Sequence, residues 1–418
     1  MNIHLVRKIM KKISKLDINY IALFASMFFG NCCLGAYLSA YLLDLGFTNT
    51  LIGTTLAIGS ILSIVVQPIV ASIADKLQKM SLRTLLAILY SISCILVAII
   101  WVVPFAFPKH AIIPTAVLFV ILNSIAGAEG ALVTSLGMEH NYGGNGINFS
   151  LARGCGSFAY AISCLIVGFL VDDFGSVFLV PANLGFKIIT LILVATFPKP
   201  TKVLSESGVD TAKEDSENAS SLLAFAKENA RFLLVVLSFV LVYSVTAVLN
   251  NFSIQLIDHV GGSESKVGIA TSIAAFTELP AMALFPIILK RVGSVSNIMK
   301  FAAVMMIIKS FITAFAPSVE WIYVSQLFQC VSFALLLPCS VYYVNRFVPR
   351  KDKVKGQSFM NMTLSIASIV VTLFGGKIID TLGIGVLVKI AAFLCLAGAV
   401  MMFVFAHKDN TPPEKKQA

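Results

Sequence analysis

The feature that most constrains this chain is a series of twelve apolar runs, each long enough to cross a lipid bilayer as a helix. Only 12% of its 418 residues are charged, whereas soluble domains have about a quarter. Inside a bilayer every backbone N–H and C=O group needs a partner within the protein, and helices meet that need. The sequence therefore predicts an all-α integral membrane protein with twelve transmembrane helices.

One connection between the apolar runs differs from the others. It is long and polar, with the composition of a linker between domains. It separates the runs into two groups of six. We therefore expect a terminal segment at 1–17, a six-helix bundle at 18–197, the linker at 198–228, a second bundle at 229–407 and a tail at 408–418.

The net charge of +10 comes from lysines and arginines placed between the apolar runs rather than in one patch. Most of them fall on the side of the membrane that also holds both termini. The opposite side holds Lys109, Lys266 and Lys377. The positive-inside rule then predicts a multi-pass cell-membrane protein with both termini in the cytoplasm. This distribution does not suggest nucleic acid as a partner.

The two groups of six carry matching short motifs. Gly168-Phe-Leu-Val-Asp172-Asp-Phe-Gly175 ends the fifth run, and Gly376-Lys-Ile-Ile-Asp380-Thr-Leu-Gly383 ends the eleventh with the same spacing. The second and eighth runs also share a glycine near their start, Gly53 or Gly268. These matches favour a duplicated six-helix unit, as in transporters that bind substrate between two repeats.

Ionisable residues at membrane depth are costly and are commonly functional. Arg153 and Glu278 are the main candidates, Glu129 and Lys309 follow, and we expect Glu129 to pair with Arg153. Lys187 is a weaker candidate, because its long side chain could reach water at the membrane surface.

Several local motifs resemble a known family. These are Gly35-Ala36-Tyr37, Gln67-Pro68 with Asp75-Lys76, Asn148-Phe149-Ser-Leu-Ala152-Arg153 with Gly156, and Pro286 with Lys290-Arg291-Val-Gly293. Together they resemble the major facilitator superfamily over about residues 17–407. Within it, the chain is similar to the oligosaccharide/proton symporter branch that includes lactose permease, with the nucleoside/proton symporters close by.

The resemblance implies roles for particular residues. Arg153 corresponds to a sugar-binding arginine, and Tyr160 to an aromatic residue that stacks on the sugar. Glu278 has a spacing to Pro286 similar to that of an acid in the nucleoside symporters, and because few acids lie within the spans, it is the expected carrier of a coupled proton. Asp75 and Lys76 would take part in gating. The branch's tenth-helix histidine and acid become Gln329 and Ser332 here, which makes lactose itself doubtful as the substrate. The expected substrate-binding set is Arg153, Glu129, Tyr160, Tyr37, Asn123, Gln329 and Lys309.

These features predict a secondary active transporter that imports a sugar or oligosaccharide with protons, as a monomer. A nucleoside/proton symporter and a drug or metabolite efflux antiporter are the alternatives. The five histidines and eight cysteines form no metal-ligand spacing, so neither a metal nor an enzyme is expected. A nucleotide-binding glycine loop is also absent from the sequence, so no cofactor and no direct ATP coupling are expected. The short loops leave no room for the soluble domain of a receptor.

Overall fold

The computed structural model describes residues 14–76, 81–142, 147, 149–198, 225, 227–349 and 352–407. Every regular element in this part of the chain is a helix, and twelve spans are long and apolar enough to cross a membrane. The predicted fold class is therefore confirmed. Serines begin several helices in the usual way; Ser14, for example, accepts a hydrogen bond from the backbone N–H of Asp17, whose carboxylate bonds back to Ser14.

The first half supplies six spans. They are formed by α2 (Lys15–Gly35) with α3 (Leu38–Asp44), α4 (Asn49–Lys76), α5 (Leu82–Ala106), α6 (Ile112–Tyr142), α7 (Phe149–Phe174), and η1 (Ser176–Phe178) with α8 (Leu179–Thr196).

The second half supplies the other six, two of which are interrupted. They are α11 (Ala230–Val242) with α12 (Ser244–Asn251) and α13 (Ser253–His259), α14 (Glu264–Val292), α15 (Val295–Ala314), α16 (Val319–Leu327) with η2 (Phe328–Cys330) and α17 (Phe333–Phe347), α18 (Lys353–Leu382), and α19 (Ile384–Phe405).

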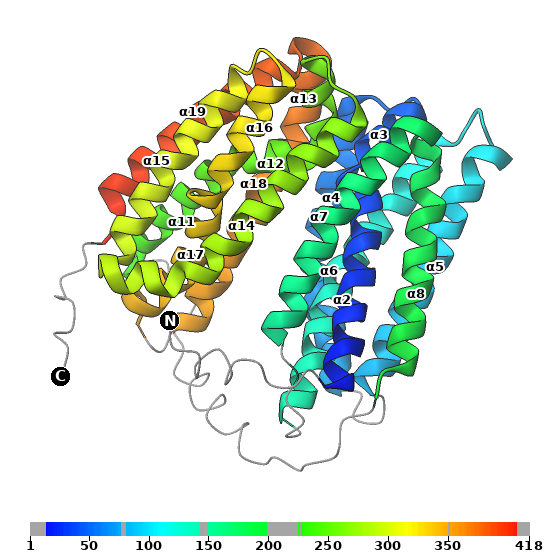
Figure 1. Cartoon of the computed structure of the whole chain (residues 1–418), viewed down its shortest axis with the longest axis horizontal. Coiled ribbons are helices and arrows are strands. Elements are labelled where there is room, and N and C mark those ends of the chain that lie inside the picture. The colour runs from blue at the N-terminus through cyan, green and yellow to red at the C-terminus, as the bar shows by residue number, and fades with distance from the viewer. Residues whose placement is uncertain are drawn as a thin grey trace.

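The helices of the two halves lie side by side, α2–α8 on one side of the molecule and α11–α19 on the other (Figure 1). The halves meet chiefly where α7 packs on α14 and α4 packs on α18. Glycines permit this close approach. A Cβ atom at Gly53 would lie 2.1 Å from the carbonyl oxygen of Thr372, and one at Gly268 would lie 2.2 Å from that of Cys164.

The repeated aspartates lie at the end of this interface where α4 and α14 begin, which we call the closed end, and each caps a helix of the other half. The Asp380 carboxylate accepts hydrogen bonds from the backbone N–H groups of Asn49 (3.1 Å) and Thr50 (2.8 Å) at the start of α4. The Asp172 carboxylate accepts one from the backbone N–H of Ser265 (3.1 Å) at the start of α14. A helix N-terminus favours a negative charge, so both contacts hold the halves together at this end.

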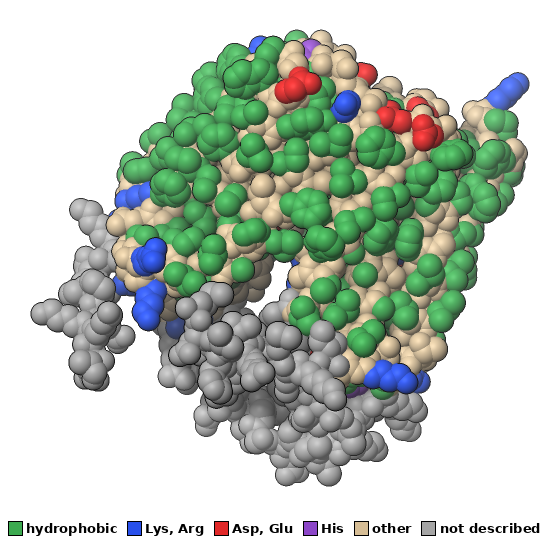
Figure 2. Space-filling model, viewed as in Figure 1, with side chains coloured by type: hydrophobic (Ala, Val, Ile, Leu, Met, Phe, Trp, Pro, Cys, Tyr) green, Lys and Arg blue, Asp and Glu red, His purple; other side chains and the backbone are tan. Residues whose placement is uncertain are grey.

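The opposite end of the molecule is open. Figure 2 shows a hollow between the halves at the end where α2 begins and α8 ends. On this face, the acidic side chains gather at the closed end. Among the described residues, the two halves are therefore joined by helix contacts at one end and separated at the other.

Candidate functional site: a cavity between the two halves

A cavity of about 470 Å³ lies between the halves. Helices α2, α3, α4, α6, α7 and α8 of the first half line it, together with α12, α13 and α14 of the second. Its polar wall consists mainly of amides and hydroxyls, from Asn31, Ser39, Thr55, Ser60, Asn123, Tyr160, Asn183, Asn250, Asn251, Ser253 and Thr271. Such groups can both donate and accept hydrogen bonds.

A smaller chamber of about 60 Å³ extends the cavity into the second half. The two share Leu249, Asn250, Ser253 and Thr271 in their walls. The chamber adds Lys309, Gln326 and Gln329, so the second half contributes the charged end of the site.

An interruption of the tenth span places Gln329 in this chamber. The span changes from α16 to α17 through η2, which contains Gln329. The Lys309 ammonium donates to Gln329 Oε1, and Gln329 Nε2 donates to Glu278 Oε2 at 3.4 Å. The glutamine therefore bridges a buried cation and a half-buried carboxylate. Broken helices at mid-membrane are typical of transporter sites, because they free polar groups to face a cavity.

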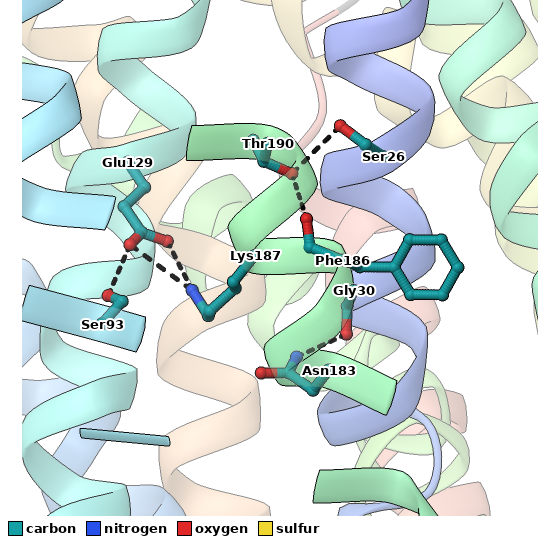
Figure 3. Close-up of polar contacts among 8 residues, drawn as sticks. All are labelled: Ser26, Gly30, Ser93, Glu129, Asn183, Phe186, Lys187 and Thr190. Carbon is teal, nitrogen blue, oxygen red and sulfur yellow. Dashed lines mark hydrogen bonds and ion pairs between the residues drawn. The ribbon is translucent and has the colours of Figure 1, made fainter. Parts of the chain in front are cut away.

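In the first half, Glu129 pairs with Lys187 and not with Arg153, so that expectation is wrong. The Lys187 ammonium lies 3.0 Å from Glu129 Oε2 and 3.4 Å from Oε1, and Ser93 donates to Oε1 at 2.5 Å (Figure 3). Both side chains are more than nine-tenths buried. Lys187 lies midway along α8, too deep to reach water at the membrane surface, and it needs a counter-ion there.

Arg153 has a different environment. Its guanidinium donates to Ser157 Oγ at 2.8 Å, one helical turn further along α7, and lies 4.8 Å from the centre of the Phe28 ring. The side chain is exposed. Arg153 is not among the described residues that line either chamber.

The remaining predicted residues divide into three groups. Asn123 and Tyr160 line the larger cavity, as a binding role requires. Tyr37 is fully buried and donates to the Cys164 carbonyl at 2.7 Å, which places it in the helix interface beside the cavity. Asp75 and Lys76 end α4, and their side chains lie outside the described residues.

Sequence reasoning did not predict several cavity residues, Asn183 among them, and it gave Lys187 little weight because its side chain could reach the membrane surface. Asn183 and Lys187 are four residues apart on α8 and so share one face of that helix. The central position of Lys187 in the sixth apolar run was the available signal.

Comparison with known proteins shows the family. The model of the "MFS_1 like family" matches residues 13–389. The chain belongs to this family. This MFS_1-like protein is 24% identical to the maltose permease of Geobacillus stearothermophilus over 301 residues, which are 72% of this chain and 73% of the relative. It is also 23% identical over 359 residues to the uncharacterized transporter YwbF of Bacillus subtilis, covering 83% of this chain and 82% of the relative.

Solved structures agree on the fold of this MFS_1-like protein. The nucleoside transporter NupG superposes with a TM-score of 0.74 at 17% identity, covering 94% of this chain and 98% of the other. A D-xylose–proton symporter superposes with a TM-score of 0.68 at 15% identity, again covering 94% and 98%. The chain is thus a multi-pass major facilitator transporter, and its relatives are transporters rather than enzymes.

Proposed function

We propose that this transporter imports a neutral, polyhydroxylated solute, a sugar or oligosaccharide, together with protons. The larger cavity carries the proposal. Among the described residues that line it, Lys187 alone is charged, and Glu129 already balances that charge. The rest of the polar wall consists of amides and hydroxyls, which suit many neutral hydroxyl groups better than an ion.

The relatives support the same class of solute. One is named a maltose permease, and a structural neighbour is named a D-xylose–proton symporter. A nucleoside is the second candidate, because its ribose offers hydroxyls and its base could stack on Tyr160, a ring in the cavity wall. NupG, whose fold this chain shares, is named a nucleoside transporter.

Glu278 is the proposed proton carrier. It is half-buried on α14 and accepts a single long hydrogen bond from Gln329 among the described residues. Protonation would neutralise the carboxylate and weaken its attraction to Lys309 in the same half and to Arg153 in the other half. That change gives the proton an influence on how the two halves are arranged.

The orientation follows from the charge pattern. With both termini in the cytoplasm, the open end in Figure 2 faces inward and the aspartate-capped end faces outward. This is the state from which an importer releases its solute. In the outward-open state, Asp75 and Lys76 would help to close the inner end. The two halves supply a complete site, so a monomer is the proposed functional unit.

The test is uptake into liposomes that contain the purified protein. Radiolabelled maltose, D-xylose, D-glucose and uridine are supplied outside, with the lumen alkaline or at equal pH. We expect at least one of these solutes to accumulate against its gradient only when the pH gradient is imposed. Uptake of none of them would refute the proposed substrate classes.

Glu278→Gln tests the coupling separately. The variant should still exchange labelled for unlabelled solute, because exchange needs no net proton movement, but a pH gradient should no longer drive accumulation. Unaltered accumulation in Glu278→Gln would exclude Glu278 as the proton carrier. Glu320→Gln, a change of an exposed acid at the closed end, serves as the matched control.

A further inference from the structure

One face of α8 carries a polar pair that the transport mechanism above does not use. Asn183 and Lys187 lie one helical turn apart, and both line the larger cavity. Figure 3 shows the Asn183 side-chain oxygen pointing away from Gly30, toward the side of α8 on which the Lys187 ammonium lies.

Asn183 has an acceptor without a partner. Its Nδ2 group donates to the Gly30 carbonyl at 2.7 Å, which fixes the orientation of the amide. Its Oδ1 atom is buried and has no hydrogen-bond partner among the described residues. The whole residue is 2% exposed. Buried polar groups are normally satisfied, so this oxygen points to a group that arrives from the cavity.

Lys187 has a donor to spare. Its ammonium carries three N–H groups, and the two Glu129 oxygens account for two of them. Ser93 holds the carboxylate from its other side, so Glu129 keeps the ammonium in place. The ammonium also lies 5.3 Å from the centre of the Tyr90 ring. No other described residue accepts a hydrogen bond from it, so its third N–H can bond a group in the cavity.

We propose that Asn183 and Lys187 form a subsite for a vicinal diol of the substrate. One hydroxyl donates its proton to Asn183 Oδ1, and the neighbouring hydroxyl accepts from the Lys187 ammonium. A carboxylate or phosphate would fit less well, because Asn183 presents an oxygen and Glu129 already neutralises Lys187. This inference rests on the proposed function and adds to it the groups of the substrate that are recognised in the first half.

Two variants remove the subsite. Asn183→Leu deletes the unpaired oxygen. The double variant Lys187→Met/Glu129→Gln removes the ion pair together, so that no unpaired charge is buried. Thr190→Val is the matched control. Thr190 lies on the same helix and donates to Ser26 of α2 at 3.0 Å, much as Asn183 donates to Gly30 of α2. Unlike Asn183, it does not line the cavity.

Binding is measured on purified, monodisperse protein by calorimetry, with uridine against 2′-deoxyuridine and D-glucose against its 2-, 3- and 4-deoxy derivatives. For the wild type, we expect removal of one hydroxyl of the bound diol to weaken binding by about tenfold, the usual effect of one lost hydrogen bond to a charged or buried group. In Asn183→Leu the penalty for the hydroxyl that donates to Asn183 should fall below about twofold. In the double variant the penalty for the neighbouring hydroxyl should fall in the same way, while Thr190→Val should keep both penalties.

The outcomes separate this inference from the proposed function. If the wild type binds uridine or D-glucose but every deoxy penalty persists in both variants, water satisfies Asn183 and the subsite is refuted while the transport proposal stands. The same holds if the wild type binds the probes without any deoxy penalty. If it binds none of the probes, the subsite is refuted, and uptake of maltose and D-xylose decides the transport proposal separately. Should the double variant fail to fold, Asn183→Leu decides the outcome alone.

Discussion

Removal of the two aspartate caps should shift the protein toward states that are open at the end now closed. Asp172 and Asp380 each bind the start of a helix in the opposite half, so both contacts must break when the halves separate there. Loss of a helix cap costs about 0.5–2 kcal/mol. Because both carboxylates are exposed, solvent screens them, and about 1 kcal/mol each is appropriate. The double variant Asp172→Ala/Asp380→Ala therefore loses about 2 kcal/mol, which changes the ratio of the two states by about 30-fold.

The assay is a distance measurement between spin labels by pulsed electron paramagnetic resonance. Phe107 and Phe315 suit the labels, because both are more than half exposed at the closed end and belong to different halves. In the double alanine variant we expect a new population at longer distance. If its distance distribution matches that of the wild type, the caps do not hold this end closed.

A matched control separates charge from hydrogen bonding. Asp172→Asn/Asp380→Asn keeps an acceptor oxygen at each helix start but removes the negative charge. Asparagine is a good cap, so this variant should shift the distances less than the alanine variant. An equal shift in both would mean that charge at the helix start, and not hydrogen bonding, supplies the whole effect.

Three further predictions follow from other contacts. Gly53→Ala places a Cβ atom 2.1 Å from the Thr372 carbonyl oxygen and should lengthen the distance between labels at Phe107 and Phe315. Gly130→Ala, whose Cβ atom would have no neighbouring atom within 4 Å, should leave that distance unchanged. The same label distance in both variants would contradict the steric argument. Lys187→Met leaves the Glu129 carboxylate buried without its cation and should lower the free energy of unfolding by about 3 kcal/mol. Thermal unfolding should show that a second substitution, Glu129→Gln, largely restores the lost stability. Burial and the nearby Arg231 lower the pKa of His407 from its usual 6.5, so the unfolded chain binds the proton more readily than the folded protein does. The free energy of unfolding should therefore fall as the pH drops below about 6.5. His407→Phe should flatten the dependence of Tm on pH between 7.5 and 5, and an unchanged slope would exclude His407 as the source of that dependence.

The fold could be predicted because a bilayer leaves few choices. Each apolar run of sufficient length must become a helix, and the structure has helices close to where the runs were placed. The short motifs were also informative. The matching Gly-x3-Asp-x2-Gly segments at Asp172 and Asp380 indicated duplication, and in the structure both perform the same capping. Their partners, the starts of α14 and α4, could not be inferred, because spacing along one helix does not reveal which helix lies beside it.

The partners of the buried charges could be predicted less well. Glu129 and Arg153 lie on neighbouring segments of sequence, α6 and α7, and the choice between Arg153 and Lys187 depends on how α6 is rotated about its axis. Over a helix that is apolar all round, sequence pattern does not fix that rotation. The depth of Lys187 along α8 was the stronger physical signal, because a buried lysine at mid-membrane needs a carboxylate more than an exposed arginine does.

The two halves hold their buried lysines in different ways, and the difference assigns different tasks to the two glutamates. Glu129 contacts Lys187 directly at 3.0 Å and also accepts from Ser93, so a proton on Glu129 would have to replace an ion pair in a closed site. Glu278 is linked to Lys309 through Gln329, which donates to Glu278 Oε2 at 3.4 Å. Protonation of Glu278 therefore breaks no direct ion pair, which supports its proposed role as the proton carrier, whereas Glu129 holds the Lys187 ammonium in place.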